Sequence, residues 1–252
     1  MHFIPAMRRC ALEYLWNMLP TSLNYHQRVP TLVEGCYSRN PALSYKPHVL
    51  LTLLALSTEY QLVALLPLLY YYIAQWPVGW ITEGVPAASM EYEYNDSSSP
   101  GDSRFQLPQK QAIIVLAGRD KLIQMRGTKV FNFMEGFTSS GVTLDTPTPG
   151  CDGAKRQETG ETCFEWLMRV WFFMNRLGFI ARPTALDIMN MGQWTELRRN
   201  CCEACAERVI GHMLSGRDEV WKAIPGAFGC HTWDFVVEQQ KTVEEGFEAE
   251  IC

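Results

Sequence analysis

The longest apolar run of the chain does most to constrain its fold. Residues 49–76 read VLLTLLALSTEYQLVALLPLLYYYIAQW, and the centre of this run, STEYQ, is polar. A carboxylate such as that of Glu59 costs about 2.5–3.5 kcal/mol in the middle of a membrane span, which disfavours a span. The run instead predicts two buried helices joined by a turn, and Pro67 should kink or restart the second helix. Because three consecutive tyrosines at 70–72 circle that helix, we expect at least one ring near the surface.

Length and charge exclude several classes of protein. With 252 residues the chain can bury a proper hydrophobic core without disulfides. Its formal net charge of -5 lacks the basic excess that supplies most nonspecific nucleic-acid affinity, so we expect no nucleic-acid partner. The N-terminal MHFIPAMRRCALEYLWNML has neither the apolar core nor the cleavage pattern of a secretory signal. We therefore expect an intracellular protein, cytoplasmic or nuclear, without a membrane partner.

Apolar residues recur at steps of three and four along the chain, which is typical of helices. No stretch alternates between apolar and polar residues for long enough to predict a sheet. The sequence therefore predicts an all-α fold, an irregular multi-helix domain with two long loops. Besides the hairpin, the expected helices cover residues 7–19, 107–137, 164–177 and the stretch after Thr195 that includes Cys202 and Cys205. We expect the first three to end at Pro20, near Gly136 and at Gly178.

Two stretches lack the apolar surface that packing needs. Residues 90–106, which begin MEYEYNDSSSPGDS, predict a flexible loop between a helical region at 1–89 and a C-terminal helical region at 107–252. We expect these two regions to pack as one unit. The second loop, TSSGVTLDTPTPGCDGAKRQETGETC, carries Cys151 and Cys163.

Cys202 and Cys205 form a CxxC pair, and three interpretations of it stay open. The chain has nine cysteines, which in a reducing compartment are free thiols or metal ligands more readily than disulfides. As a zinc clamp the pair needs two further thiolate or imidazole ligands, because structural zinc is tetrahedral. Cys151 and Cys163 could supply them, and the metal would cross-link a loop that cannot hold itself in place by apolar burial.

The other two interpretations need no metal. As packing residues, Cys202 and Cys205 would share one buried face of an amphipathic helix. As a redox pair, they would follow a strand and open a helix, whose N-terminus lowers the pKa of the first thiol. No strand is predicted before Cys202. The sequence also contains no phosphate-binding loop, dinucleotide fingerprint, HExxH motif or GxSxG elbow, so we expect no enzyme activity.

Five segments of the chain occur in a characteristic order. They are MRRCALEYLWNMLPTSL, LLALSTEYQLVALLPLLYYYIAQWPVGWITEGVP, LPQKQAIIVLAGRDKLIQ, PTPGC and CEACAERVIGHMLSGRDEVWKAIPGAFG, the last followed by Trp233. In this order they resemble the region that follows the BTB/POZ domain in fungal BTB proteins, over most of the chain. Similar sequences also carry cysteines after the PTPGC-like turn and in the CxxC pair. The resemblance therefore implies structural zinc bound by the four cysteines named above.

The resemblance further implies a non-catalytic module that binds an unidentified protein partner, as the substrate-presenting half of a BTB-type adaptor. Residues 1–252 contain no stretch that resembles a BTB domain, so we expect that dimerisation and cullin binding do not carry over. Two alternatives stay open: a thiol-redox enzyme that uses Cys202 and Cys205, and a truncated fragment without a function.

Overall fold

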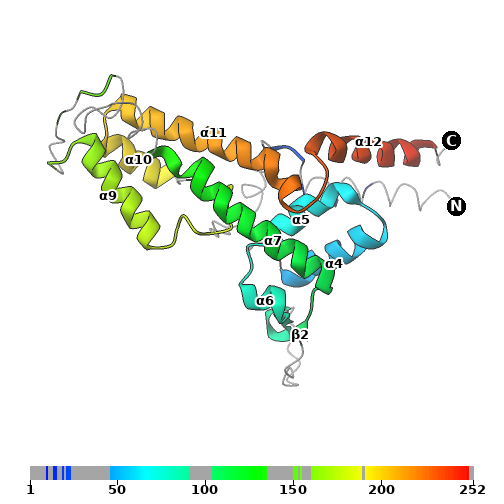
Figure 1. The fold of residues 1–252 in the computed structure, drawn as a ribbon. Coiled ribbons are helices and arrows are strands. Elements are labelled where there is room, and N and C mark those ends of the chain that lie inside the picture. Colours follow the sequence, from blue (N-terminus) through cyan, green and yellow to red (C-terminus); the bar gives the residue numbers. More distant parts are fainter. Residues whose placement is uncertain are drawn as a thin grey trace. The chain divides into compact units, whose positions relative to one another are not determined.

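The computed structural model describes residues 10, 14–15, 19, 21–23, 46–90, 104–134, 150–152, 154, 160–188 and 191–249. Over these residues the chain is mainly helical, with a single pair of two-residue strands, which confirms the predicted all-α fold (Figure 1). Packing divides the chain into two compact units: unit 1 is Met1–Arg119 with Lys222–Cys252, and unit 2 is Asp120–Trp221. Most of the predicted helix at 7–19 and of the two predicted loops lies outside the described residues, and the regional boundaries at 90–106 stay a prediction.

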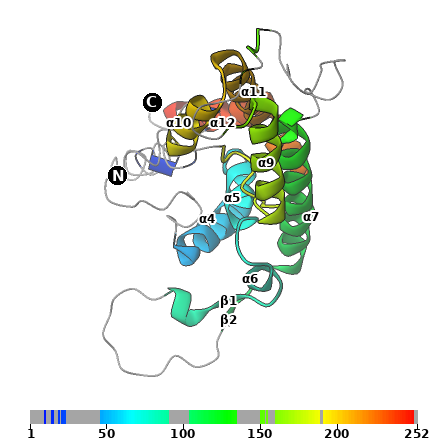
Figure 2. The same cartoon turned by 90° about the vertical axis from the view of Figure 1, so that its left-hand side faces the viewer.

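Unit 1 contains the predicted helical hairpin and the small sheet. Its described elements are α4 (Pro47–Glu59), η2 (Val63–Leu65), α5 (Leu66–Ile73), α6 (Val78–Thr82), β1 (Val85–Pro86), η3 (Ala87–Met90), β2 (Arg104–Phe105) and α12 (Trp233–Ala249), with the start of α7 (Gln109–Met125) and the end of α11 (Glu203–Ala227). α4 packs against α5, and α12 packs against η2. β1 and β2 pair antiparallel, with Val85 opposite Phe105 (Figure 2).

The polar centre of the apolar run makes the turn of the hairpin. α4 ends at Glu59, and Gln61 follows in the left-handed region at φ 53°. Pro67 lies in the first turn of α5, where its missing N–H removes no helical hydrogen bond, so it starts the helix as predicted. Among the described residues, no helix is both long enough and apolar enough to cross a membrane.

All three tyrosines of α5 are buried, so the prediction of a ring near the surface is wrong. The reason is that neighbours enclose this helix. The ring of Phe228 lies 5.8 Å from that of Tyr70, and Gly118 of α7 leaves room for it, because a Cβ there would overlap the Phe228 ring. Arg119 donates a hydrogen bond to the carbonyl of Ala74, just beyond the end of α5.

Unit 2 is built from helices and turns over its described residues. Its elements are the end of α7, the π-helical turn η4 (Arg126–Val130), the short helical turn η5 (Asn132–Met134), α9 (Cys163–Arg176), α10 (Met191–Asn200) and the start of α11. Gly178, at φ 65°, follows α9 and confirms the predicted stop. Leu122, Leu167 and Val209 are fully buried and contribute to its core.

The helix predicted to end near Gly136 ends earlier. α7 stops at Met125, and the wider turn η4 continues the chain. This change of winding accompanies the burial of Arg126, which donates hydrogen bonds to the carbonyls of Phe179, at 3.2 Å, and of Thr184. A buried guanidinium needs such acceptors, because an unpaired charge inside a protein is costly.

The helix predicted after Thr195, with both cysteines in it, is two helices. α10 ends at Asn200, whose side-chain amide donates to the carbonyl of Glu196 at 2.9 Å. α11 begins at Glu203. The two residues between the helices therefore include the first cysteine of the CxxC pair.

Candidate metal centre

Cys202 and Cys205 lie at the N-terminal end of α11. Cys202 occupies the gap between α10 and α11 and is partly exposed, whereas Cys205 lies in the first turn and is fully buried. Two cysteines separated by two residues are a common ligand pair in structural zinc sites. The hypothesis that both pack on one buried helical face does not hold for Cys202.

Cys163 is the first residue of α9 and is fully buried. A capping box fixes this helix start. The backbone N–H of Glu165 donates to the Thr162 hydroxyl at 3.3 Å, and the backbone N–H of Thr162 donates to the Glu165 carboxylate at 2.8 Å. These two hydrogen bonds hold the backbone on both sides of Cys163.

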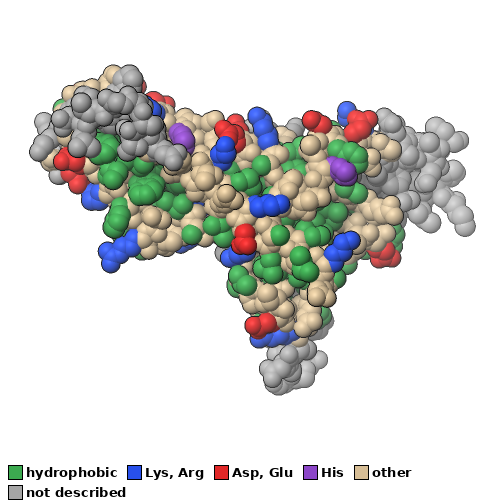
Figure 3. All heavy atoms as spheres, in the orientation of Figure 1, with side chains coloured by type: hydrophobic (Ala, Val, Ile, Leu, Met, Phe, Trp, Pro, Cys, Tyr) green, Lys and Arg blue, Asp and Glu red, His purple; other side chains and the backbone are tan. Residues whose placement is uncertain are grey.

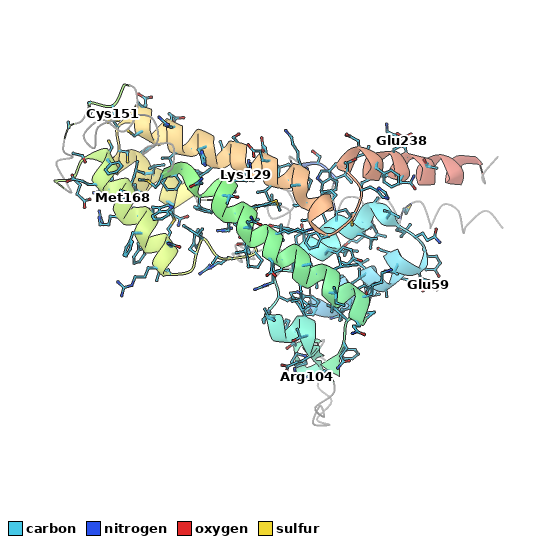
Figure 4. The ribbon with its side chains drawn as sticks, in the orientation of Figure 1. Glu59, Arg104, Lys129, Cys151, Met168 and Glu238 are labelled. Atoms are coloured by element: carbon cyan, nitrogen blue, oxygen red, sulfur yellow. The ribbon has the colours of Figure 1, made fainter. Side chains whose placement is uncertain are left out.

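Cys151 comes from a segment that precedes α9 in the chain. It follows Gly150, whose φ of 85° favours glycine. A Cβ at Gly150 would touch the side chain of Ala204 at 3.7 Å, so the backbone here lies against the first turn of α11. Figure 4 shows Cys151 beside that end of α11.

The four sulfur atoms all lie within 4.8 Å of one another. Around a tetrahedral zinc ion with Zn–S bonds of about 2.3 Å, sulfur atoms are about 3.8 Å apart. The arrangement therefore has to contract by at most about 1 Å to fit such an ion. The structure brings together every cysteine predicted as a ligand, and the four lie close enough to hold a metal ion.

The surroundings of Cys202 favour its thiolate, the form of cysteine that binds metals. The backbone N–H of Cys202 donates to the sulfur of Cys163 at 3.1 Å. Burial raises the pKa of the Cys202 thiol, but hydrogen bonds with the Cys205 backbone and with the other thiols more than offset this, so the pKa falls below its ordinary value. Cys202 also lies at the N-terminus of α11, where the helix dipole favours negative charge.

The structure has only part of the arrangement expected of a redox CxxC pair. Cys202 does precede a helix, but the element before it is α10 and not a strand. A signal for this helix start was present in the sequence, since Glu203 directly follows Cys202 and an acidic residue favours the first turn of a helix. The sequence-based prediction nevertheless placed both cysteines in one helix, because their spacing fits a single helical face.

No family model, curated protein or solved structure matches the chain. The resemblance to post-BTB regions therefore stays a prediction. What the cluster can do follows from its own chemistry: four thiolates saturate a tetrahedral ion and leave no position for a water or a substrate.

Proposed function

We propose that the chain is a non-catalytic protein-interaction module in which a structural zinc ion holds unit 2 together. The observation that carries this proposal is the convergence of four cysteines from three separate segments. Zinc bound by four thiolates is typical of structural sites, whereas catalytic sites keep one position open. Zinc bound here would tie the start of α9, the start of α11 and the Cys151 segment to one point.

The ligand set narrows the choice of metal. Soft sulfur donors favour zinc, copper(I) and iron–sulfur clusters over magnesium and calcium. An iron–sulfur cluster places several atoms between its cysteines, so its thiolates are held further apart than those around a single ion. Sulfur atoms within 4.8 Å of one another suit a single tetrahedral ion. Reduced thiolates persist in the cytoplasm and the nucleus, where we propose that the module acts.

The interaction role rests on the resemblance to post-BTB regions and on the surface of α9. Met168 (labelled in Figure 4) and Phe172 lie one turn apart on this helix and are exposed by 38% and 62%. Neighbouring exposed apolar side chains are typical of a protein-binding surface. In the proposed role the module presents a substrate protein within a BTB-type adaptor. Cullin binding belongs to the BTB half and is not part of the proposal.

Metal analysis of purified, untagged protein tests the zinc proposal. We expect about one zinc per chain in the wild type, and loss of bound zinc when any of the four cysteines is replaced by serine. Cys201→Ala is the matched control, because Cys201 is buried beside Cys202 but lies outside the cluster. This variant should keep its zinc. Wild-type protein that stays metal-free after refolding with a zinc salt would refute the proposal.

Affinity capture tests the interaction role separately. The wild-type chain and the Phe172→Asp variant serve as paired baits under reducing conditions. We expect at least one protein to bind the wild type and to be lost with the variant, because a carboxylate at this position opposes apolar burial. Recovery of no partner at any stringency would count against the role, whatever the zinc content.

A thiol-redox enzyme is the second candidate, favoured by the lowered pKa of Cys202. It predicts that one cysteine reacts rapidly with an alkylating agent at neutral pH in the metal-loaded protein. The zinc proposal predicts slow reaction of all four until a chelator is added. Mass spectrometry of the alkylated peptides separates these outcomes. A truncated fragment without a function would unfold without cooperativity, so a sharp thermal transition would count against that third alternative.

A further inference from the structure

A groove in unit 2 runs beside α9 and has both apolar and charged walls. It contains a cavity of about 230 Å³, and its lining includes Trp166, Phe173 and Leu177 of α9, Phe179 and Arg182 after that helix, and Glu196 of α10. Phe173 and Leu177 are each 59% exposed, so they stand at its open side. In Figure 3 hydrophobic side chains gather over α9.

The apolar lining is divided into projecting and recessed parts. Phe173 and Leu177 project into solvent and gain most from a partner that removes them from water. Trp166, in contrast, is already buried in the floor of the groove. A partner that fits this surface must both fill the cavity and cover the two projecting side chains.

Among the described residues that line the groove, Arg182 is the one cation and Glu196 the one anion. The Arg182 guanidinium lies over the Phe179 ring at 5.0 Å, and the Glu196 carboxylate accepts a hydrogen bond from the Asn200 amide at 2.7 Å. Both charged groups are thus oriented by a neighbour. In a two-fold dimer the same patch of each copy meets the other, so Arg182 of one copy can pair with Glu196 of the other, and the reverse. A partner of a single sign would place a like charge against one of the two groups.

We propose that this groove binds the same groove of a second copy of the chain. In the two-fold dimer, Phe173 and Leu177 of each copy enter the groove of the other. Arg182 of each copy pairs with Glu196 of the other, so the ion pair occurs twice. This inference goes beyond the proposed zinc module and requires only a folded unit 2.

Sedimentation velocity of the zinc-loaded full chain tests the proposal. The wild type should shift from monomer to dimer as its concentration rises. Arg182→Glu or Glu196→Arg alone should weaken dimerisation about tenfold or more, because each dimer then contains two contacts between like charges. The double variant, which exchanges the two charges, should restore dimerisation, because each copy again offers one charge of each sign.

Two neighbouring phenylalanines provide a matched control. Phe173→Ala should weaken the dimer, and Phe172→Ala should not, because the two side chains are similarly exposed but only Phe173 lines the groove. Zinc content and circular dichroism of each variant distinguish a failure of the metal site from a failure of the groove. The proposal is overturned if the chain stays monomeric at every concentration, or if neither charge reversal changes the affinity of the dimer. A different protein that binds the monomer and is lost with Phe173→Ala would also overturn it.

Discussion

The carboxyl of Asp187 lies in an environment that disfavours its charge. Burial raises its pKa to about 6, and the charge of Arg126, a hydrogen bond with Thr184 and the charge of Arg182 only partly offset this effect. In the unfolded chain the carboxyl has its ordinary pKa of 3.8. Between these two values the folded state binds the proton more tightly than the unfolded chain does, so protonation stabilises the fold.

Asp187→Asn should remove this pH dependence. The stabilisation that protonated Asp187 gives is fully present below about pH 4 and is lost as the pH rises through about 6. The uncharged asparagine should therefore raise the free energy of unfolding at neutral pH, by at most about 3 kcal/mol, and have little effect near pH 4. Urea unfolding of both proteins across this range measures the difference.

Asp120→Asn is the matched control for this experiment, because Asp120 is an exposed aspartate on α7. The difference in free energy of unfolding between Asp120→Asn and the wild type should show no comparable change with pH. If the difference in free energy of unfolding between Asp187→Asn and the wild type stays constant from about pH 4 to about pH 7, burial of the Asp187 carboxyl does not govern its protonation.

At the residue scale, the sequence identified the candidate ligands but not Asp187. The cysteines could be picked out by residue type and by the CxxC spacing, because few side chains bind soft metals. The environment of Asp187 depends instead on a loop that packs beside the buried Arg126. No local pattern encodes that contact, since it joins segments far apart in the chain.

At the scale of elements, α11 crosses η4 closely, and Gly216 permits the crossing. A Cβ at Gly216 would overlap the backbone carbonyl of Lys129. Beside this point the Lys129 ammonium pairs with the Glu219 carboxylate at 3.0 Å. Because the obstacle is backbone, it cannot turn aside as the end of a flexible side chain could.

Gly216→Ala should destabilise unit 2 by about 1–3 kcal/mol, the usual cost of overpacking, and by more if the backbone cannot shift. Gly211→Ala is the matched control in the same helix, because a Cβ there meets nothing within 4 Å. Alanine is favoured over glycine inside a helix by about 1 kcal/mol, so this variant should be slightly more stable than the wild type. Thermal unfolding followed by circular dichroism measures both. Changes of the same sign would show that the crossing does not require glycine.

The sequence predicted helices better than helix ends. The end of α9 at Gly178 was predicted because a glycine stop is a local signal. The end of α7 was not, because it accompanies the burial of Arg126 against residues of a distant segment. The break before Cys202 was also missed, since apolar spacing continues across it and only the packed structure separates the two helices.

At the scale of the whole molecule, the candidate metal centre belongs to unit 2 alone. All four cysteines lie within Asp120–Trp221. Unit 1 has a core of its own, in which Leu50, Leu65 and Leu69 are fully buried. Zinc should therefore hold the starts of α9 and α11, while apolar burial holds α4 and α5.

Removal of the metal should consequently affect the two units differently. Hydrogen exchange of the zinc-loaded protein, measured before and after addition of a chelator, should accelerate most at the starts of α9 and α11, because these ends lose their cross-link. Exchange in α4 and α5 should change much less, because their protection comes from the apolar core of unit 1, whereas all four cysteines lie in unit 2.

The variant with serine at all four ligand positions is the control for this experiment. Its exchange should match that of the chelated wild type, and the chelator should not change it further. An equal acceleration in α4 and α5 would mean that the metal holds both units and that the apolar core of unit 1 is insufficient alone. No acceleration anywhere would mean that the cysteines pack without a metal. The lowered pKa of Cys202 would then favour thiol chemistry over a structural ion.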